Sequence, residues 1–396
     1  MAFEQTWRWF GPQDPISLEE IRQTGATGIV TALHDVPVGK IWTEEAIMER
    51  KRRIAAEGMS WSVAESLPVH DDIKRRNGNY HRFIENYRLS LRNLGRCGID
   101  TVCYNFMPVL DWSRTDLHVE FSDGSITTKF ELAAFAAFDI YLLHRPGAEQ
   151  SYSGEQLRKA RQLIARMHED EKVRLLQTIL LGFPGSGDAF TLEGLRAALE
   201  TYEGMNETGL RENLHLFLKE VIPVAEEAGV FIALHPDDPP WPLLGLPRIV
   251  GTESDLDFVV QAANSPHNGI TFCTGSLGAG AENNLVRMSQ RFAERISFVH
   301  LRNVRRTGER DFLEDNHMEG DVDMYGVMTA LLREQRRRTD AGQSQHRMPM
   351  RPDHGHLMAA DRHRKGIYPG YSLFGRMRGL AELRGMEIAI RRACNL

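Results

Sequence analysis

The feature that most constrains the fold is a metal-ligand side chain at the end of each of four short apolar runs. These runs lie in the C-terminal two-fifths of the chain and end at His235, Cys273, His300 and Asp353. In a (β/α) barrel, side chains at the C-terminal ends of successive parallel strands face one crevice. Two imidazoles, a thiolate and a carboxylate in one crevice are typical of a divalent metal site.

The rest of the chain alternates strand-like and helix-like segments, which predicts a parallel sheet with right-handed crossovers. In the N-terminal part, strands are expected at 28–33, 60–64 and 101–105. Together with the four ligand-bearing runs, this makes seven strands. The eighth strand is expected within 366–374, before a closing helix over 376–392.

Residues 109–213 interrupt this rhythm, because they contain helix-like segments and no convincing barrel strand. The segment 122–125 is a turn and marks a small hairpin tip. We therefore expect a single α/β domain over 1–396, a (β/α)8 TIM barrel with a helical insertion at 109–213 after strand 3. A separate helical domain is the alternative for this insertion.

Composition limits the classes of partner and compartment. The formal charge of −6 argues against a nucleic-acid-binding protein, which normally carries a basic excess. The chain contains no apolar run of about 18 residues, so no membrane partner is expected. Its four cysteines have no paired CxxC spacing, which favours a reducing, cytoplasmic localisation. A homo-oligomer is compatible with the sequence, which leaves the oligomeric state open.

Each candidate ligand, taken alone, could also be a buried structural residue. The prediction of a metal site therefore depends on the four occurring together. The thiolate and imidazoles suit Zn(II) or Fe(II), and the carboxylate admits Mn(II). A closed tetrahedral zinc site would be structural, whereas ligands at strand ends favour an open, catalytic site. Arg302 is suited to pair with a carboxylate, with a structural ion pair as the alternative. His354 and His356 are candidate acid–base groups, with packing as the alternative.

Several blocks of this sequence point to a known family. The most specific are HPDDPP at 235–240 and RPDHGH at 351–356. Others are the blocks at 8–11, 25–30, 33–34, 272–276, 300–303, 312–317, 320–324 and 366–371. With these blocks the sequence resembles the mannonate dehydratase family from end to end.

The resemblance implies a TIM barrel that binds Fe(II) or Mn(II) through the four strand-end residues. It also implies catalytic roles for His354 and Tyr368, although the sequence does not say which is the acid and which the base. The implied reaction converts D-mannonate, a small sugar acid, into 2-keto-3-deoxy-D-gluconate and water in hexuronate breakdown. The residues expected to contact the substrate are Arg8, His34, Asn105, Arg302 and His317.

Two other functions remain open. One is a sugar isomerase or epimerase on the same fold, although a thiolate such as Cys273 is unusual in such sites. A metal-dependent endonuclease is a weaker variant, opposed by the negative charge. The other is a barrel that binds a sugar acid without catalysis, which the pair His354 and Tyr368 opposes. The polar segment 303–324 is expected to be a mobile loop covering the site.

Overall fold

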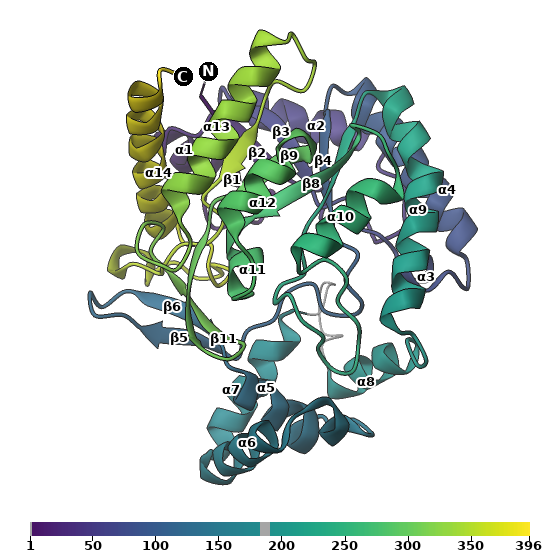
Figure 1. Cartoon of the computed structure of the whole chain (residues 1–396), viewed down its shortest axis with the longest axis vertical. Coiled ribbons are helices and arrows are strands. Elements are labelled where there is room, and N and C mark those ends of the chain that lie inside the picture. Colours follow the sequence, from purple (N-terminus) through teal and green to yellow (C-terminus); the bar gives the residue numbers. More distant parts are fainter. Residues whose placement is uncertain (1, 183–190) are drawn as a thin grey trace.

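The computed structural model describes residues 2–182 and 191–396 and contains a closed barrel of eight parallel strands (Figure 1). The strand order around the barrel is β1-β12-β9-β8-β7-β4-β3-β2. The strands are β1 (Glu4–Arg8), β2 (Gly28–Thr31), β3 (Ser60–Glu65), β4 (Thr101–Tyr104), β7 (Phe231–Leu234), β8 (Asn268–Cys273), β9 (Ile296–His300) and β12 (Pro349–Arg351). The predicted TIM-barrel class is therefore confirmed.

The strand that closes the barrel is β1, and the expectation of an eighth strand within 366–374 is wrong. β1 pairs in parallel with β12, where Glu4 lies opposite Pro349, and with β2, where Thr6 lies opposite Gly28. Residues 366–372 form a loop instead, and a helix starts at Leu373. With β1 counted, the insertion follows the fourth strand, β4, and not the third.

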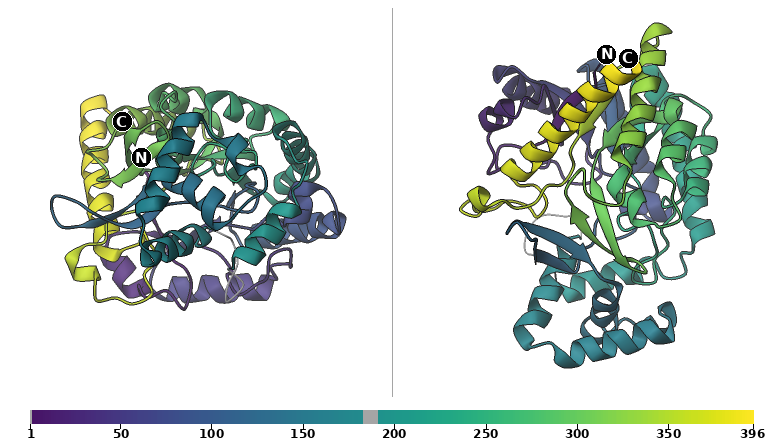
Figure 2. Two further views of the ribbon diagram at one scale, coloured as in Figure 1. Left: turned by 90° about the horizontal axis from the view of Figure 1, so that it is seen from below. Right: turned by 60° about the vertical axis from the view of Figure 1, so that its left-hand side comes forward.

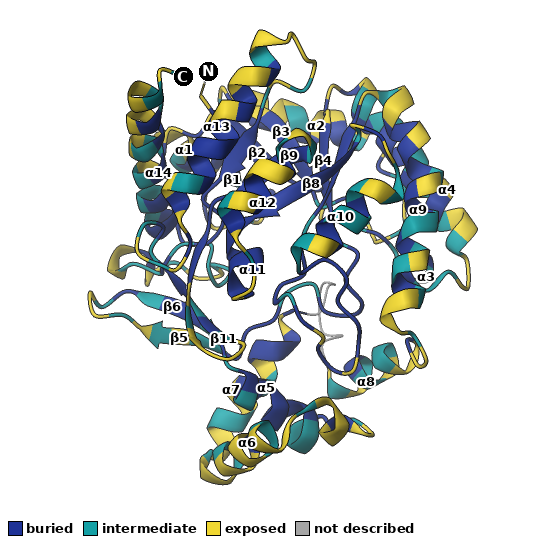
Figure 3. Ribbon diagram, in the orientation of Figure 1, coloured by how far each residue is buried: buried dark blue, intermediate teal, exposed yellow. Residues whose placement is uncertain are grey.

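Helices surround this barrel, as the view along its axis shows (Figure 2). They are α1 (Leu18–Gln23), α2 (Glu44–Ala56), α3 (Asp71–Arg75), α4 (Tyr80–Arg96), α9 (Glu207–Ala228), α10 (Glu253–Ala262), α11 (Thr274–Ala279), α12 (Leu285–Arg291), α13 (Met324–Asp340) and α14 (Leu373–Cys394). Local sequence sets their ends: Thr43 caps α2 by accepting from the amide of Ala46, and Gly58 follows with φ +75°. The strands are buried and the outer helix faces are exposed (Figure 3).

The insertion forms a layer beyond the C-terminal ends of the barrel strands (Figure 1). It contains β5 (Asp116–Glu120), β6 (Ile126–Phe130), α5 (Leu132–Ala137), α6 (Gly154–Arg166), α7 (Glu169–Leu180) and α8 (Leu192–Glu200). The predicted hairpin tip at 122–125 is confirmed, because it joins β5 to β6. The next barrel helix, α9, begins at Glu207, so the insertion ends earlier than residue 213.

The segment 303–324 is not the polar loop that the sequence predicted. Its first half forms an antiparallel hairpin of β10 (Asn303–Gly308) and β11 (Asp311–Asp315). β11 pairs with β6 of the insertion, which gives a four-stranded sheet in the order β10-β11-β6-β5. Phe312 of β11 stacks on Phe130 of β6, with ring centroids 5.9 Å apart. This pairing and packing join the hairpin to the insertion.

Within the part of the chain that the structure describes, no helix is long and apolar enough to cross a membrane.

Candidate active site

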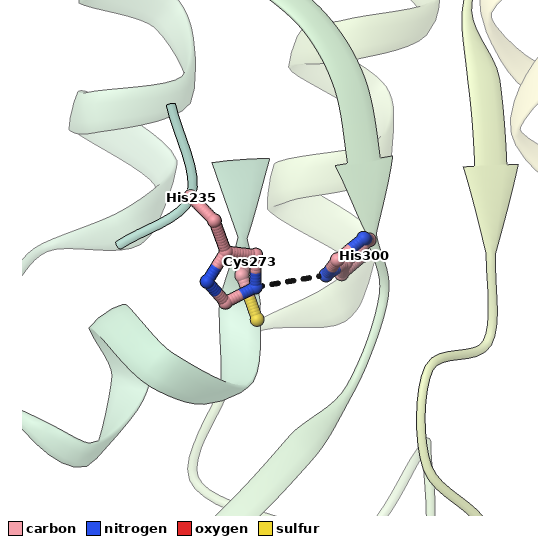
Figure 4. A group of neighbouring side chains, drawn as sticks. All are labelled: His235, Cys273 and His300. Atoms are coloured by element: carbon pink, nitrogen blue, oxygen red, sulfur yellow. Dashed lines mark hydrogen bonds between the residues drawn. The ribbon is translucent and has the colours of Figure 1, made fainter. Parts of the chain in front are cut away.

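Three of the four predicted metal ligands converge at the C-terminal end of the barrel (Figure 4). His235 follows β7, Cys273 ends β8 and His300 ends β9. One ligand atom from each lies within 4.8 Å of the others, and Nε2 of His235 is 3.1 Å from Nδ1 of His300. Neighbouring parallel strands place these side chains together, as the sequence predicted.

The surroundings of His235 set the form of its imidazole, and those of Cys273 hold its sulfur in place. Nδ1 of His235 lies 2.7 Å from the carbonyl of Pro236, so Nδ1 carries the hydrogen and the Nε2 lone pair faces the centre. Burial lowers the pKa of His235, which favours this neutral imidazole. The sulfur of Cys273 accepts hydrogen bonds from the amide and the hydroxyl of Ser276, at 3.5 and 3.2 Å. Two donors hold the sulfur in place beside the imidazoles.

Asp353 borders this group but is held by two arginines. It follows β12 and has a left-handed backbone, φ +63°. Its Oδ2 is 3.7 Å from the Cys273 sulfur and 3.2 Å from Nη1 of Arg302, and its Oδ1 binds Arg351. Burial would raise the pKa of Asp353, but Arg351 and the other neighbouring cations hold it well below its usual range. Asp353 as fourth ligand stays a prediction.

These four residues fit a divalent first-row ion. Imidazole, thiolate and carboxylate donors suit Fe(II), Mn(II) or Zn(II), and the arrangement leaves one side of the group open to a cavity. An open side is what distinguishes a catalytic site from a closed structural one.

A cavity of about 410 Å³ lies against this group and brings together most of the predicted site residues. The predicted residues that line it are Arg8, His34, Asn105, His235, Arg302, Asp353, His354 and Tyr368. The residues of its lining that the sequence reasoning missed include Glu65, Asp111, Trp112, Asp238, Arg351 and Tyr371.

Cys273 and His300 lie beneath this lining, in the ligand group, and two further predicted histidines, His317 and His356, lie outside both. Nε2 of His317 lies 2.7 Å from the carbonyl of Pro352, and its ring packs tightly against Gly379 of α14. This places His317 behind the turn at Asp353, so its predicted contact with substrate is not what the structure shows. His356 lies 2.9 Å from the hydroxyl of Ser125, in the β5–β6 hairpin. This contact agrees with the packing alternative for His356.

Comparison with known proteins identifies the family to which this chain belongs. The model of the D-mannonate dehydratase (UxuA) family matches residues 3–395. The chain belongs to the D-mannonate dehydratase family. A mannonate dehydratase from Chromohalobacter salexigens is 54% identical over 389 residues, 98% of this chain and 99% of the relative. One from Marinomonas sp. is 52% identical with the same coverage. The family resemblance seen in the sequence is thus confirmed.

Solved structures agree with this assignment. The crystal structure of mannonate dehydratase from Streptococcus suis serotype 2 matches with a TM-score of 0.77 and 35% identity, over 100% of this chain and 95% of that one. A xylose isomerase-like TIM barrel protein from Mycobacterium smegmatis matches with a TM-score of 0.52 and 11% identity, over 98% and 97% of the two chains. The second likeness concerns the barrel fold alone.

In this member of the D-mannonate dehydratase family, buried charges surround the cavity. Arg302 contacts three carboxylates: Asp238 at 2.7 Å, Glu314 at 3.2 Å and Asp353 at 3.2 Å. Burial would lower the pKa of Arg302, but Asp238 and Glu314 raise it well above its usual value. Its charge is therefore shared among protein carboxylates, which agrees with the structural ion-pair alternative. Arg351, between Asp353 and Glu65, is held in the same way.

Two phenols line the cavity, and they differ in position. The hydroxyl of Tyr368 donates to the carbonyl of Leu181 at 3.2 Å, and burial raises its pKa. The ring of Tyr371 meets the ring of His354 edge-on, with centroids 5.0 Å apart. Burial also raises the pKa of Tyr371, while the charge of Arg351 lowers this pKa and that of Asp353 raises it. Tyr371 lies in the family-like block at 366–371, which is the signal that could have identified it.

Proposed function

We propose that this protein dehydrates D-mannonate by removing the proton from C2 and the hydroxyl from C3. Breaking the C2–H bond leaves an electron pair that forms the C2–C3 double bond as hydroxide leaves C3. The enol then takes a proton at C3 and becomes 2-keto-3-deoxy-D-gluconate, with one water released. The observation that supports this function is a cavity lined by His235 and Asp353 of the predicted ligand set, by the imidazole of His354 and by the two phenols.

The chemistry divides between the barrel and its loops. His235, Cys273 and His300, with Asp353, would hold Fe(II) or Mn(II), and a bound ion supplies Lewis-acid stabilisation of the charge that develops on the substrate oxygens. The protein must supply the two proton transfers, one at C2 and one at the leaving hydroxyl. We assign the first to His354, because its ring lines the cavity beside Asp353 without belonging to the convergent ligand group.

A phenol is suited to protonate the leaving hydroxide, because burial keeps both Tyr368 and Tyr371 protonated at neutral pH. Tyr368 stays the candidate that the family resemblance names. Position favours Tyr371, since its ring contacts His354, whereas the hydroxyl of Tyr368 is directed to Leu181. Replacing each separately by Phe distinguishes them.

Other polar side chains of the cavity lining suit the hydroxyls of a sugar acid. Burial and the nearby charge of Arg8 lower the pKa of His34 to about 3, so this imidazole is neutral at pH 7. A neutral imidazole and the amide of Asn105 can both donate to and accept from hydroxyl groups. Arg8 belongs to the same lining, where its Nη1 lies 3.5 Å from Oε2 of Glu65, and we propose it as the cation for the substrate carboxylate.

The four cysteines, Cys97, Cys103, Cys273 and Cys394, are all unpaired. The thiolate of Cys273 must stay reduced to bind a metal, which supports our proposal that the enzyme works in the reducing cytoplasm.

The direct test uses anaerobically purified protein supplied with Fe(II) or Mn(II) and a panel of epimeric aldonic acids. We expect a 2-keto-3-deoxy product from D-mannonate. His354→Asn and the Phe variant of the acting tyrosine should keep metal and lose about 10²- to 10⁴-fold in turnover, the range for a general acid or base. In deuterated solvent, the variant lacking the acid should still exchange the C2 proton, and the variant lacking His354 should not. Normal turnover by His354→Asn would refute its assignment.

A further inference from the structure

The carboxylate of Glu314 contacts the side of His354 that faces away from the proposed reaction. Glu314 belongs to β11, in the hairpin that the sequence presented as a loop, and its Oε1 lies 3.1 Å from Nδ1 of His354. We infer that Glu314 is a positioning residue, which holds His354 in the tautomer with hydrogen on Nδ1 and a free lone pair on Nε2. This inference rests on the proposed role of His354 as the group that takes the C2 proton.

The hydrogen-bond partners around Nδ1 favour this tautomer over the other. A second neighbour, Nη1 of Arg302, lies 3.3 Å from Nδ1 and would favour a lone pair there. That nitrogen, however, also pairs with Oδ2 of Asp353 at 3.2 Å, and its contact with Nδ1 is longer than the 3.1 Å contact that Glu314 makes. A carboxylate has no hydrogen to donate, so a lone pair on Nδ1 would face the negative oxygen of Glu314 without a bond. Hydrogen on Nδ1 satisfies the closer of the two contacts.

The carboxylate of Glu314 is itself held in place and held ionised. Its Oε1 accepts from Nη2 of Arg114, a residue with no exposed surface, and its Oε2 is 3.2 Å from Nε of Arg302. Burial would raise the pKa of Glu314, but Arg302, His354 and Arg114 together lower it to about 2. A fixed negative charge at Nδ1 is what a tautomer-setting partner requires.

The rest of the surroundings hold the ring of His354 in one orientation. Gly370, with φ +83°, approaches so closely that a Cβ there would lie 3.0 Å from Cγ of His354. Trp112 and Tyr371 meet the imidazole edge-on, with centroids at 6.3 and 5.0 Å. Nε2 lies on the side of Asp353, 3.9 Å from its Oδ1. The free lone pair is therefore next to the metal-ligand group, where the substrate would bind.

The test compares Glu314→Gln, Glu314→Asp and a matched control, Asp315→Asn. The control removes a carboxylate from the same strand, where it pairs with Arg305 and has no contact with His354. Full-length protein labelled with ¹⁵N-histidine and loaded with Zn(II), a diamagnetic probe, reports which imidazole nitrogen carries hydrogen. The His354 signal is assigned by its absence from His354→Gln. Turnover is measured on Mn(II)-loaded protein with D-mannonate.

We expect wild type to carry hydrogen on Nδ1 and Glu314→Gln to populate hydrogen on Nε2, because an amide can donate to Nδ1. Turnover of Glu314→Gln should fall about 10²- to 10⁴-fold, as when a histidine takes the wrong tautomer, with KM changed by less than about threefold. Glu314→Asp keeps the charge and should lose less turnover than Glu314→Gln. Asp315→Asn should retain both wild-type readouts.

The inference is overturned if Glu314→Gln keeps either the wild-type tautomer or the wild-type turnover. It is also overturned if Asp315→Asn loses as much turnover as Glu314→Gln. Thermal unfolding and metal content of each variant separate these results from misfolding. Should Glu314→Gln fail to fold, Glu314→Asp decides by its tautomer. Normal turnover by His354→Gln would refute the proposed function of His354 itself, and the ¹⁵N spectra would then decide the Glu314 contact alone.

Discussion

Arg114 offers the sharpest test of the buried charges that surround the site. It has no exposed surface, and its guanidinium binds Asp238 through two contacts, at 2.7 and 3.2 Å, and also binds Glu314. Arg114→Met keeps most of the side-chain volume and removes the charge. Two buried carboxylates would then share Arg302 with Asp353.

The expected loss of stability follows from this burial. Removing one partner of a buried ion pair destabilises a protein by about 3–5 kcal/mol. The unfolding entropy is about 2.1 cal/mol/K per residue, or about 0.8 kcal/mol/K for 396 residues. Arg114→Met should therefore lower Tm by about 4–6 °C, measured by calorimetry of the metal-free protein. The control is Arg174→Met, which removes an exposed pair with Asp170 and should leave Tm unchanged.

The pH dependence of this Tm difference tests whether the lost charge of Arg114 causes it. In wild type, burial would raise the pKa of Asp238, but Arg114 and Arg302 hold it well below its usual range, so its stabilising effect persists down to about pH 4. Without Arg114, only Arg302 remains to offset the burial of Asp238, and we expect the pKa of Asp238 to rise above its unfolded value. Such a group gains stability as pH falls through that raised pKa. The Tm difference should therefore narrow from pH 8 to pH 5. A difference below about 1 °C at pH 8, or one that widens in acid, would refute this reasoning.

Four further outcomes are expected. Cys273→Ser should lose metal while keeping its fold, and stoichiometric metal in Cys273→Ser/His300→Ala would refute the ligand assignment. EDTA should abolish turnover, and Mn(II) or Fe(II) should restore it; turnover that survives chelation would contradict a metal-dependent reaction. His34 has a folded pKa of about 3 against about 6.5 unfolded, so it costs stability as pH falls between these values. The Tm of His34→Gln should therefore fall less than the wild-type Tm between pH 7 and pH 4.5. An equal fall in both proteins would count against the lowered pKa of His34. Limited proteolysis should spare 303–315 with or without substrate, whereas protection only by substrate would support a mobile cover.

The parts of the fold that the sequence predicted are those with local signals. Seven barrel strands are short apolar runs, and each predicted metal ligand ends one of them or follows shortly after it. β1 has no such run, because Glu4, Gln5 and Arg8 interrupt it, and its place is set by pairing with β12 about 340 residues away. The β10–β11 hairpin escaped notice for a related reason. Its outer positions are charged, and the sheet it joins includes β6, which is distant in the chain.

The sequence also did not predict the buried ion pairs that Arg114 forms with Asp238 and Glu314. Arg114 and Glu314 are 200 residues apart, and Asp238 is 124 residues from Arg114. Charged residues in a single sequence are normally assigned to the surface, because burial without a partner is unfavourable. Only the fold shows that these partners meet, and that they do so behind His354.

The arrangement divides the site between two structural units. The convergent metal donors follow or end barrel strands, so their positions depend on the barrel. Of the neighbours of His354, Arg302 follows β9, but Glu314 comes from the hairpin, and Arg114, which holds Glu314, comes from the insertion. Changes in the hairpin or the insertion should therefore lower turnover while metal binding stays intact, and changes at the strand ends should abolish both. Variants at Glu314 and at Cys273 belong to these two classes, so metal content measured beside turnover tests the division directly.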